Sequence, residues 1–536
     1  RAARFAKLLG QMLMVRARLT EDPEALKQGR EYLQRALDNA GDGSTREKGA
    51  IWNDLAVTAL TAAEASNDAS DYEFAVDALN HALTFFDPGG TLDEAIIRLD
   101  EAGRSAPRGS DTFQAALKVV EEALDPTAPK QQVEDWSMAK HNLGVALRGL
   151  ARLRDEPALR DDALKAYDLA LKARKATGNL RDAASTQMNI GNIHSDRASD
   201  SIEGAYTQAI EAYEKAVELY DSKAYPVPFA DAVLKLSNAV LDGEGEADGE
   251  VVERALSVLK EASAVVDPSA AGADLAEIFN NMGRAHYALA LQRDDAEHHR
   301  SAVAAYRRAS EIWAAQPRSA AIAERNMGYA LYELGRIEDD AEAFSQAAAA
   351  HERALTFWSP QKEPGEFART EFSRGQAKHE LAIRTDALDD YRAALESYRA
   401  ALGIWTGQKD DADWAYANRN AGHMLFAIGL QTDEITNFEQ AAAAYLNAAA
   451  GFAAADNLAE KAEAEFERGR AWHEIAYRNE DEAGWRKALD AYGEAIAAGA
   501  GETSVGETIG YAHYNRAVIY QALAAGDAAT LRQAAN

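Results

Sequence analysis

Cysteine is absent from the 536 residues, and several other features are scarce. Without cysteine the chain has no disulfide framework, no thiolate zinc ligand and no thiol nucleophile. Aromatic residues make up 8 % of the chain and proline contributes 12 residues, while 47 % of the residues are apolar and 27 % are charged. No uninterrupted apolar run approaches the roughly 18 residues that a membrane-spanning helix needs. This composition is typical of a helix-rich soluble protein.

Basic residues are outnumbered. The 57 lysines and arginines face 87 acidic residues, which gives a net charge of −30. A field of that sign repels phosphate backbones and anionic lipid surfaces, so neither nucleic acid nor a membrane is an expected partner. The N-terminal segment 1–19 has basic residues scattered through it and lacks the apolar core of a secretory leader. We expect a cytoplasmic protein.

What the chain does contain is an internal repeat, which decides the fold. A glycine preceded by an apolar residue, and often by asparagine, recurs at intervals of 45, 47, 47 and 47 residues from Gly283 onward. Projecting this period toward both ends gives about twelve units. The anchor glycines are Gly144, Gly191, Gly283, Gly328, Gly375, Gly422 and Gly469, with weaker anchors at Gly10, Ala56, Gly103, Asn238 and Arg516.

A second marker has the same period. Nineteen residues after most anchors stands an Ala-x3-Tyr-x2-Ala pattern, as in Ala394, Tyr398 and Ala401. Spacings of four and three place the three side chains on one helix face. Each unit is therefore predicted to be two amphipathic helices, one with the glycine and one with the tyrosine, joined by a polar turn. Glycine costs about 1 kcal/mol relative to alanine inside a helix, so its recurrence indicates close backbone packing.

These markers resemble the tetratricopeptide repeat (TPR) family, whose unit reads W-x2-L-G-x2-Y, then A-x3-F, then A and P. The present units are longer than the usual ~34 residues, and their length alone would equally suit armadillo or HEAT repeats. The glycine-to-tyrosine register favours a long TPR variant. Such units are similar to arrays in bacterial proteins that regulate a CHAT-type peptidase or a signalling ATPase.

The predicted fold is all-α, a right-handed solenoid of about twelve helix-turn-helix repeats. Residues 1–83 hold two repeats, residues 84–135 form an irregular repeat and candidate joint, and residues 136–536 form the regular array. No capping helix follows the last unit, and solenoid ends need caps. The ends are therefore open to self-association or to fusion with a further part of the protein.

No catalytic motif is present. The chain lacks a phosphate-binding G-x4-G-K-[ST] loop and a G-x-S-x-G nucleophile. The segments HELAI at His379 and HEIAY at His473 lack the second histidine of a zinc-binding H-E-x-x-H. We expect no enzyme activity, no metal and no cofactor.

The TPR resemblance implies that the first helix of each unit lines a concave groove. In this acidic chain the corresponding positions are rich in arginine, histidine and aromatic residues, the types enriched at binding hot spots. The alternative is that these aromatics only pack between neighbouring helices while arginine and glutamate pair across units. The predicted partner-binding residues are Arg325, Tyr329, Tyr332, Phe372, His379, Arg419, His423, Phe426, Phe466, Arg470, His473 and His513.

Asparagines recur two residues before several anchors, where family members use the amide to hold a peptide backbone. The predicted backbone-holding residues are Asn281, Asn326 and Asn420. An amide suits this role because it both donates and accepts hydrogen bonds.

The favoured function is a non-catalytic scaffold or adaptor that binds a protein or peptide segment in the groove. The alternative is a sensor or regulatory arm of a larger enzyme, for example a CHAT-type peptidase or a signalling ATPase, whose catalytic part lies outside these residues. An enzyme that acts through this chain alone is the third hypothesis.

Overall fold

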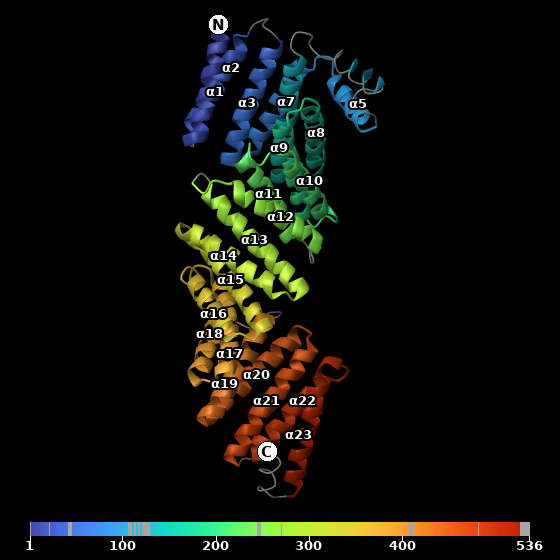
Figure 1. Ribbon diagram of the computed structural model, residues 1–536. Helices are drawn as coiled ribbons and strands as arrows, with labels where there is room; N and C mark the ends of the chain where they lie inside the picture. Colours follow the sequence, from blue (N-terminus) through green and yellow to red (C-terminus); the bar gives the residue numbers. More distant parts are fainter. Residues whose placement is uncertain are drawn as a thin grey trace. The chain divides into compact units, whose positions relative to one another are not determined.

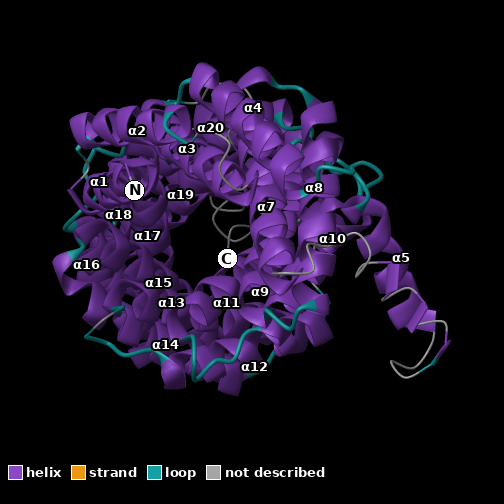
Figure 2. Cartoon of the chain, turned by 90° about the horizontal axis from the view of Figure 1, so that it is seen from above, coloured by secondary structure: helices purple, strands orange, loops and turns teal. Residues whose placement is uncertain are grey.

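The computed structural model describes residues 2–20, 22–40, 45–105, 110–111, 114–115, 118–119, 129–243, 248–269, 271–406, 412–480 and 482–525. Within these ranges the regular structure is helical, with 22 α-helices, two short 3-10 helices and no strand (Figures 1 and 2). The chain divides into two compact units, residues 1–270 and 271–536. The fold is therefore all-α, as predicted.

Unit 1 contains eleven of the described helices, and one of them stands apart from the pairing. Their bounds are α1 (Ala2–Thr20), α2 (Pro23–Asp38), α3 (Thr45–Ser66), α4 (Ala69–Phe86), α5 (Leu92–Ser105), α7 (Pro129–Arg154), α8 (Pro157–Ala176), α9 (Leu180–Ser199), α10 (Ala205–Leu219), α11 (Pro226–Leu241) and α12 (Gly249–Val265).

Unit 2 continues the helix pairs. Its helices are α13 (Gly272–Arg293), α14 (Ala296–Ile312), α15 (Pro317–Glu338), α16 (Ala341–Leu355), α17 (Pro364–Thr385), α18 (Leu388–Leu402), α19 (Ala412–Thr432), α20 (Ile435–Ala454), α21 (Leu458–Asn479), α22 (Glu482–Ala498) and α23 (Gly506–Ala525). We call the odd-numbered member of each pair helix A and the even-numbered member helix B; α5 belongs to neither set.

Acidic residues form the turn from helix A to helix B. Asp294 and Asp339 end α13 and α15 in the left-handed conformation, with φ of 52° and 53°. Aspartate tolerates this region because its short side chain can hydrogen-bond locally. The next residues, Asp295 and Asp340, cap α14 and α16 by accepting backbone N–H groups at 2.9 and 3.0 Å. The acidic turns seen in the sequence are thus stop and start signals for helices.

The anchor glycines pack beneath the aromatic ring of their own unit. A Cβ on Gly375 would lie 2.8 Å from the ring of Tyr398, and a Cβ on Gly469 would lie 2.6 Å from that of Tyr492. No side chain fits at such distances without movement of the ring. The packing role predicted for the glycines and tyrosines is confirmed in the same way by Gly144 with Tyr167, Gly191 with Tyr213, Gly283 with Tyr306 and Gly422 with Tyr445.

Helix B of one unit packs on helix A of the next. Contacts of this kind join α2 to α3, α4 to α7, α8 to α9 and α10 to α11 in unit 1, and they join every consecutive pair from α14 to α23 in unit 2. Small residues at the contact let the helices approach closely. The result in each unit is a continuous stack of helices rather than a single central core.

The region 84–135 interrupts the regular stacking of helix pairs. α4 packs directly on α7, whereas α5 contacts α8 and lies beside the stack (Figures 1 and 2). The unit predicted around Gly103 is therefore not a member of the stack, and the described helices form ten pairs followed by α23. The 22 described helices are consistent with the all-α stack of helix-turn-helix repeats that the sequence predicts. The predicted uncapped C-terminal end falls in residues 526–536, outside the described residues.

No described helix is both long enough and apolar enough to cross a membrane.

Candidate functional site

All predicted binding residues lie on A helices of unit 2. Asn281 lies on α13, and the others are distributed over α15, α17, α19, α21 and α23. Successive A helices also contact one another, as α15 does α17 and α21 does α23. We call the set of predicted residues on these A helices, buried and exposed members together, the helix A face of unit 2.

Two arginines at equivalent positions tie neighbouring units together. Arg325 of α15 forms an ion pair with Glu366 of α17, and Arg419 of α19 forms one with Glu460 of α21. The guanidinium of Arg325 also lies 4.9 Å from the ring centre of Trp358, a cation–π distance. Both arginines are partly buried. Their geometry matches the alternative interpretation, in which arginine and glutamate pair across units.

Arg470 is more accessible than either of them. Its side chain is 44 % exposed. One guanidinium nitrogen donates hydrogen bonds to both carboxylate oxygens of Glu467 at 2.9 Å. The guanidinium lies 4.9 Å from the ring centre of Phe426 on the preceding A helix. Phe426 itself is buried against Phe438. Arg470 is thus an exposed cation whose position is fixed by Glu467 and Phe426.

The three internal histidines of the face are neutral at physiological pH. Burial lowers the pKa of His379 to about 4 and that of His423 to about 3, because the charged imidazolium loses its hydration. Burial also lowers the pKa of His473, whose ring lies edge-on to Trp485. The rings of His379 and His423 lie edge-on to each other, with ring centres 6.0 Å apart. These histidines act as polar aromatic groups and not as cations.

Apart from the buried Phe426, the predicted aromatic residues are partly buried, and each packs against another ring. Phe372 lies 5.8 Å from the ring of Tyr398 and 5.7 Å from that of Trp405. Phe466 lies 5.6 Å from Tyr492. The remaining members behave in the same way: Tyr329 packs edge-on to His351, and Tyr332 packs edge-on to Phe344. Burial raises the pKa of Tyr332 to about 12, so its hydroxyl stays protonated and can donate a hydrogen bond.

The predicted asparagines differ in accessibility. Asn281 is only 1 % exposed, which places its amide inside the packing of α13. Asn420 is partly buried, and its side chain forms a hydrogen bond with the Tyr398 hydroxyl. Asn326 is also partly buried, whereas His513 of α23 is exposed. Among these four, His513 has the most freely accessible side chain.

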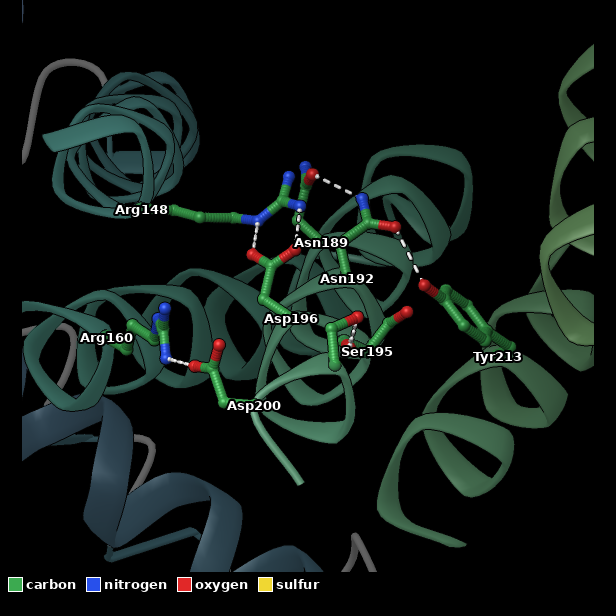
Figure 3. A network of polar contacts seen from close by, with 9 residues as sticks. Arg148, Arg160, Asn189, Asn192, Ser195, Asp196, Asp200 and Tyr213 are labelled. Atoms are coloured by element: carbon green, nitrogen blue, oxygen red, sulfur yellow. Dashed lines mark hydrogen bonds and ion pairs between the residues drawn. The ribbon is translucent and has the colours of Figure 1, made fainter. Parts of the chain in front are cut away.

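A polar network on the A helices of unit 1 was missed from the sequence. Arg148 of α7 donates to both carboxylate oxygens of Asp196 of α9, at 2.7 and 2.9 Å (Figure 3). Beside this pair, the Tyr213 hydroxyl donates to Asn192 at 2.8 Å, and Asn192 donates to Asn189 at 3.3 Å (Figure 3). The signal was available: Arg148 stands four residues after one anchor and Asp196 five residues after the next.

The described residues include no group of three or more histidine, aspartate or glutamate side chains that could hold a metal ion. On the helix A face the carboxylates of Glu366, Glu460 and Glu467 form ion pairs with arginines. The helix A face presents partly exposed aromatic rings, guanidinium groups and neutral imidazoles.

Three solved structures similar to this chain share between 11 % and 14 % sequence identity with it. They include the C-terminal part of a TPR repeat-containing protein from Cytophaga hutchinsonii, with 14 % identity, a TM-score of 0.38 and coverage of 58 % of this chain and 98 % of that chain. Aspartyl phosphate phosphatase F from Bacillus subtilis has 14 % identity, a TM-score of 0.33 and coverage of 75 % and 93 %. Yeast Tom70 has 11 % identity, a TM-score of 0.26 and coverage of 94 % and 95 %.

No family model matches the chain, and no curated protein matches its sequence. The helix-turn-helix units with their glycine–tyrosine contacts give the chain a TPR-like fold. Its function has to be inferred from the residues of the helix A face.

Proposed function

We propose that the chain is a non-catalytic scaffold that binds a protein or peptide segment along the helix A face of unit 2. The observation that supports this proposal is a pair of partly exposed aromatic rings on two A helices of unit 2, Phe372 on α17 and Phe466 on α21, together with the exposed guanidinium of Arg470 on α21. Aromatic and arginine side chains supply most of the energy at protein interfaces.

The face divides into binding and positioning residues. Phe372, Phe466, Arg470 and His513 make the direct contacts, together with Tyr329 and Tyr332. Arg325 and Arg419 act as positioning residues, because their ion pairs with the next unit fix the spacing of the helices. His379, His423 and His473 support the rings behind the surface. The excess of acidic residues elsewhere disfavours acidic partners and keeps the chain soluble.

In this proposal Asn326 and Asn420, which are partly buried, hold a peptide backbone, and Asn281 is left out because it is buried. Binding of an extended segment would use the amide of Asn420 in exchange for its contact with Tyr398. Such an exchange is close to neutral in hydrogen bonds.

A peptide-selection experiment tests the proposal. Dodecapeptides are selected from a random phage-displayed library on the wild-type chain, and the affinity of the best peptide is measured by fluorescence anisotropy. The triple variant Phe372→Ala, Phe466→Ala and Arg470→Ala is expected to weaken binding at least tenfold while the chain remains helical by circular dichroism.

The matched control separates binding from destabilisation. Phe86→Ala removes a buried ring of α4 in unit 1, so it lowers stability without touching the helix A face of unit 2. This control is expected to bind the peptide as the wild type does at a temperature where both are folded. Equal affinity of the wild type and the triple variant would show that the helix A face is not the binding surface.

A further inference from the structure

A groove of about 400 Å³ lies over α15, between the B helices α14 and α16 of unit 2. Both of these helices pack on α15. The volume falls in the range of pockets that take small molecules. We call this feature the α15 groove. It is lined by Arg307 of α14, by Met327 and Leu331 of α15, and by Gln346, Ala349 and Arg353 of α16.

The floor of the α15 groove is apolar. Met327 and Leu331 stand one residue before and three residues after the anchor Gly328, and both are buried. At about 100° per residue they lie on the side of α15 opposite Tyr329, so the groove is separate from the helix A face of unit 2. Methionine adapts its shape to what it contacts. The floor is therefore suited to an apolar group.

The equivalent positions over α17 and α19 are occupied by polar side chains that reach the neighbouring helix B. On α17, Arg374 and Lys378 replace the two apolar floor residues, and Arg374 donates to Ser397 of α18 at 3.1 Å. Above α19, Arg399 of α18 donates to Gln440 of α20 at 2.8 Å and so joins the two B helices. An arginine at this place therefore normally has a partner within the stack.

Arg307 is the counterpart of Arg399, but it lacks this partner. Each of the two arginines directly follows the ring residue of its helix, and Gln346 and Gln440 each stand five residues before theirs. In α16, Gln346 donates instead to Glu342 at 3.0 Å. Arg307 forms no hydrogen bond or ion pair within the part of the chain that the structure describes. The α15 groove thus has an unpaired guanidinium at its edge.

Charge identifies the missing partner as an anion. Arg353, on the other side of the groove, donates through Nε to Glu324 at 2.8 Å, and Glu324 also accepts from Ser310 at 2.7 Å. Glu324 balances one of the two guanidinium groups, so Arg307 and Arg353 together leave one positive charge at the groove. A single carboxylate balances that charge, and guanidinium groups bind carboxylates through charge-assisted hydrogen bonds.

We propose that the α15 groove binds a small organic molecule with one carboxylate and an apolar body. The carboxylate pairs with Arg307 and Arg353, and the apolar body lies over Met327 and Leu331. This site lies on the opposite side of α15 from the helix A face of unit 2, and it does not depend on the function proposed for that face.

The test uses octanoate as the probe, with isothermal titration calorimetry on the full chain. Octanoate is expected to bind at one site at least tenfold more tightly than octanol, which lacks the charge, and than acetate, which lacks the apolar body. The preference over octanol should shrink as the salt concentration rises. A peptide that ends in leucine carries the same chemistry on a protein C-terminus and should bind no more tightly than octanoate.

Variants of the groove locate the binding. Arg307→Gln removes only a charge from an exposed residue, so it should weaken octanoate binding at least tenfold and leave octanol binding unchanged. The matched control is Arg308→Gln, because this adjacent exposed arginine pairs with Glu311, does not line the groove and should have no effect. Ala349→Glu should abolish binding of both ligands by filling the groove, and α18 carries Glu396 at the equivalent position.

Circular dichroism and thermal unfolding establish that each variant is folded at the temperature of the titration. The proposal is wrong if octanoate does not bind saturably, if octanol binds as tightly, or if folded Arg307→Gln binds octanoate as the wild type does. Equal weakening by Arg308→Gln would also overturn it, because the effect would then be one of general charge. Binding of the leucine-terminated peptide at least tenfold more tightly than octanoate would assign the groove to a protein C-terminus instead.

Discussion

The imidazole of His351 lies on Gly328, so that a Cβ at residue 328 would come within 2.5 Å of the ring atom Cε1. In the units on either side a tyrosine occupies this place: Tyr306 lies on Gly283 and Tyr398 lies on Gly375. His351 is fully buried, and neither ring nitrogen has a hydrogen-bond partner among the described residues. One unit of the stack therefore holds a titratable ring where its neighbours hold tyrosine.

This substitution predicts a pH dependence of stability. Burial, with smaller contributions from Arg325 and Arg374, lowers the pKa of His351 from 6.5 to about 3. The unfolded chain therefore takes up the proton first, so stability is lost as the pH falls below 6.5. The expected slope from this residue is up to about 1.4 kcal/mol per pH unit. Thermal unfolding at pH 7 and pH 5 measures it.

The variant His351→Tyr should remove the part of this slope that comes from residue 351 while keeping the glycine–ring contact. His379 and His423, whose pKa values are also lowered by burial, keep their contributions. Glu371 and Glu465, whose pKa values are raised by burial, act in the opposite direction, but they are common to the wild type and the variant. His513→Gln changes an exposed histidine and should retain the wild-type slope. Equal slopes for the wild type and His351→Tyr would contradict the prediction.

Adding a methyl group at an anchor glycine should destabilise the chain. At Gly375 the new Cβ would lie 2.8 Å from the Tyr398 ring, so Gly375→Ala forces the ring aside at a cost of about 1–3 kcal/mol. Gly510 is also helical but has no atom within 4 Å of such a Cβ. Gly510→Ala should instead stabilise its helix by up to about 1 kcal/mol. Urea unfolding midpoints of the two variants should therefore move in opposite directions.

The ion pair between Arg419 and Glu460 should couple adjacent units. Both side chains are partly buried, and Arg419 also packs against Tyr416 with its guanidinium 5.1 Å from the ring centre. A double-mutant cycle with Arg419→Met and Glu460→Gln should give a coupling free energy of about 0.5–1 kcal/mol that decreases with salt.

The exposed pair of Arg308 and Glu311 within α14 is the control for that cycle. Its coupling should be smaller, because both side chains are hydrated and belong to the same helix. A coupling for Arg419 and Glu460 no larger than that of the control would mean that the pair does not hold the units together.

Local pattern was enough to predict much of this architecture. The contact of Gly375 with Tyr398, and its equivalents, follows from a fixed separation within one helical hairpin, which the sequence shows directly. The helix period and the acidic turns at Asp294 and Asp339 are likewise local. The placement of the candidate residues on A helices also follows from the repeat, although their binding role stays a prediction.

The sequence did not predict which residues of neighbouring helices these side chains contact. Arg419 pairs with Glu460, 41 residues away, and nothing local distinguishes this arrangement from an arginine that faces a ligand. The low pKa of His423 depends on burial by neighbouring helices, which composition does not reveal.

By itself the sequence determined the repeating unit, the small residues that permit close helix packing, and the faces on which aromatic and basic residues gather. Tertiary structure alone decided that α5 leaves the stack, that Arg325 and Arg419 are held by the next unit, and that burial lowers the pKa of His423. The physical reason is the separation of the interacting residues along the chain. Helix formation and hairpin packing depend on residues close in the chain, whereas burial and ion pairing depend on which helix lies alongside.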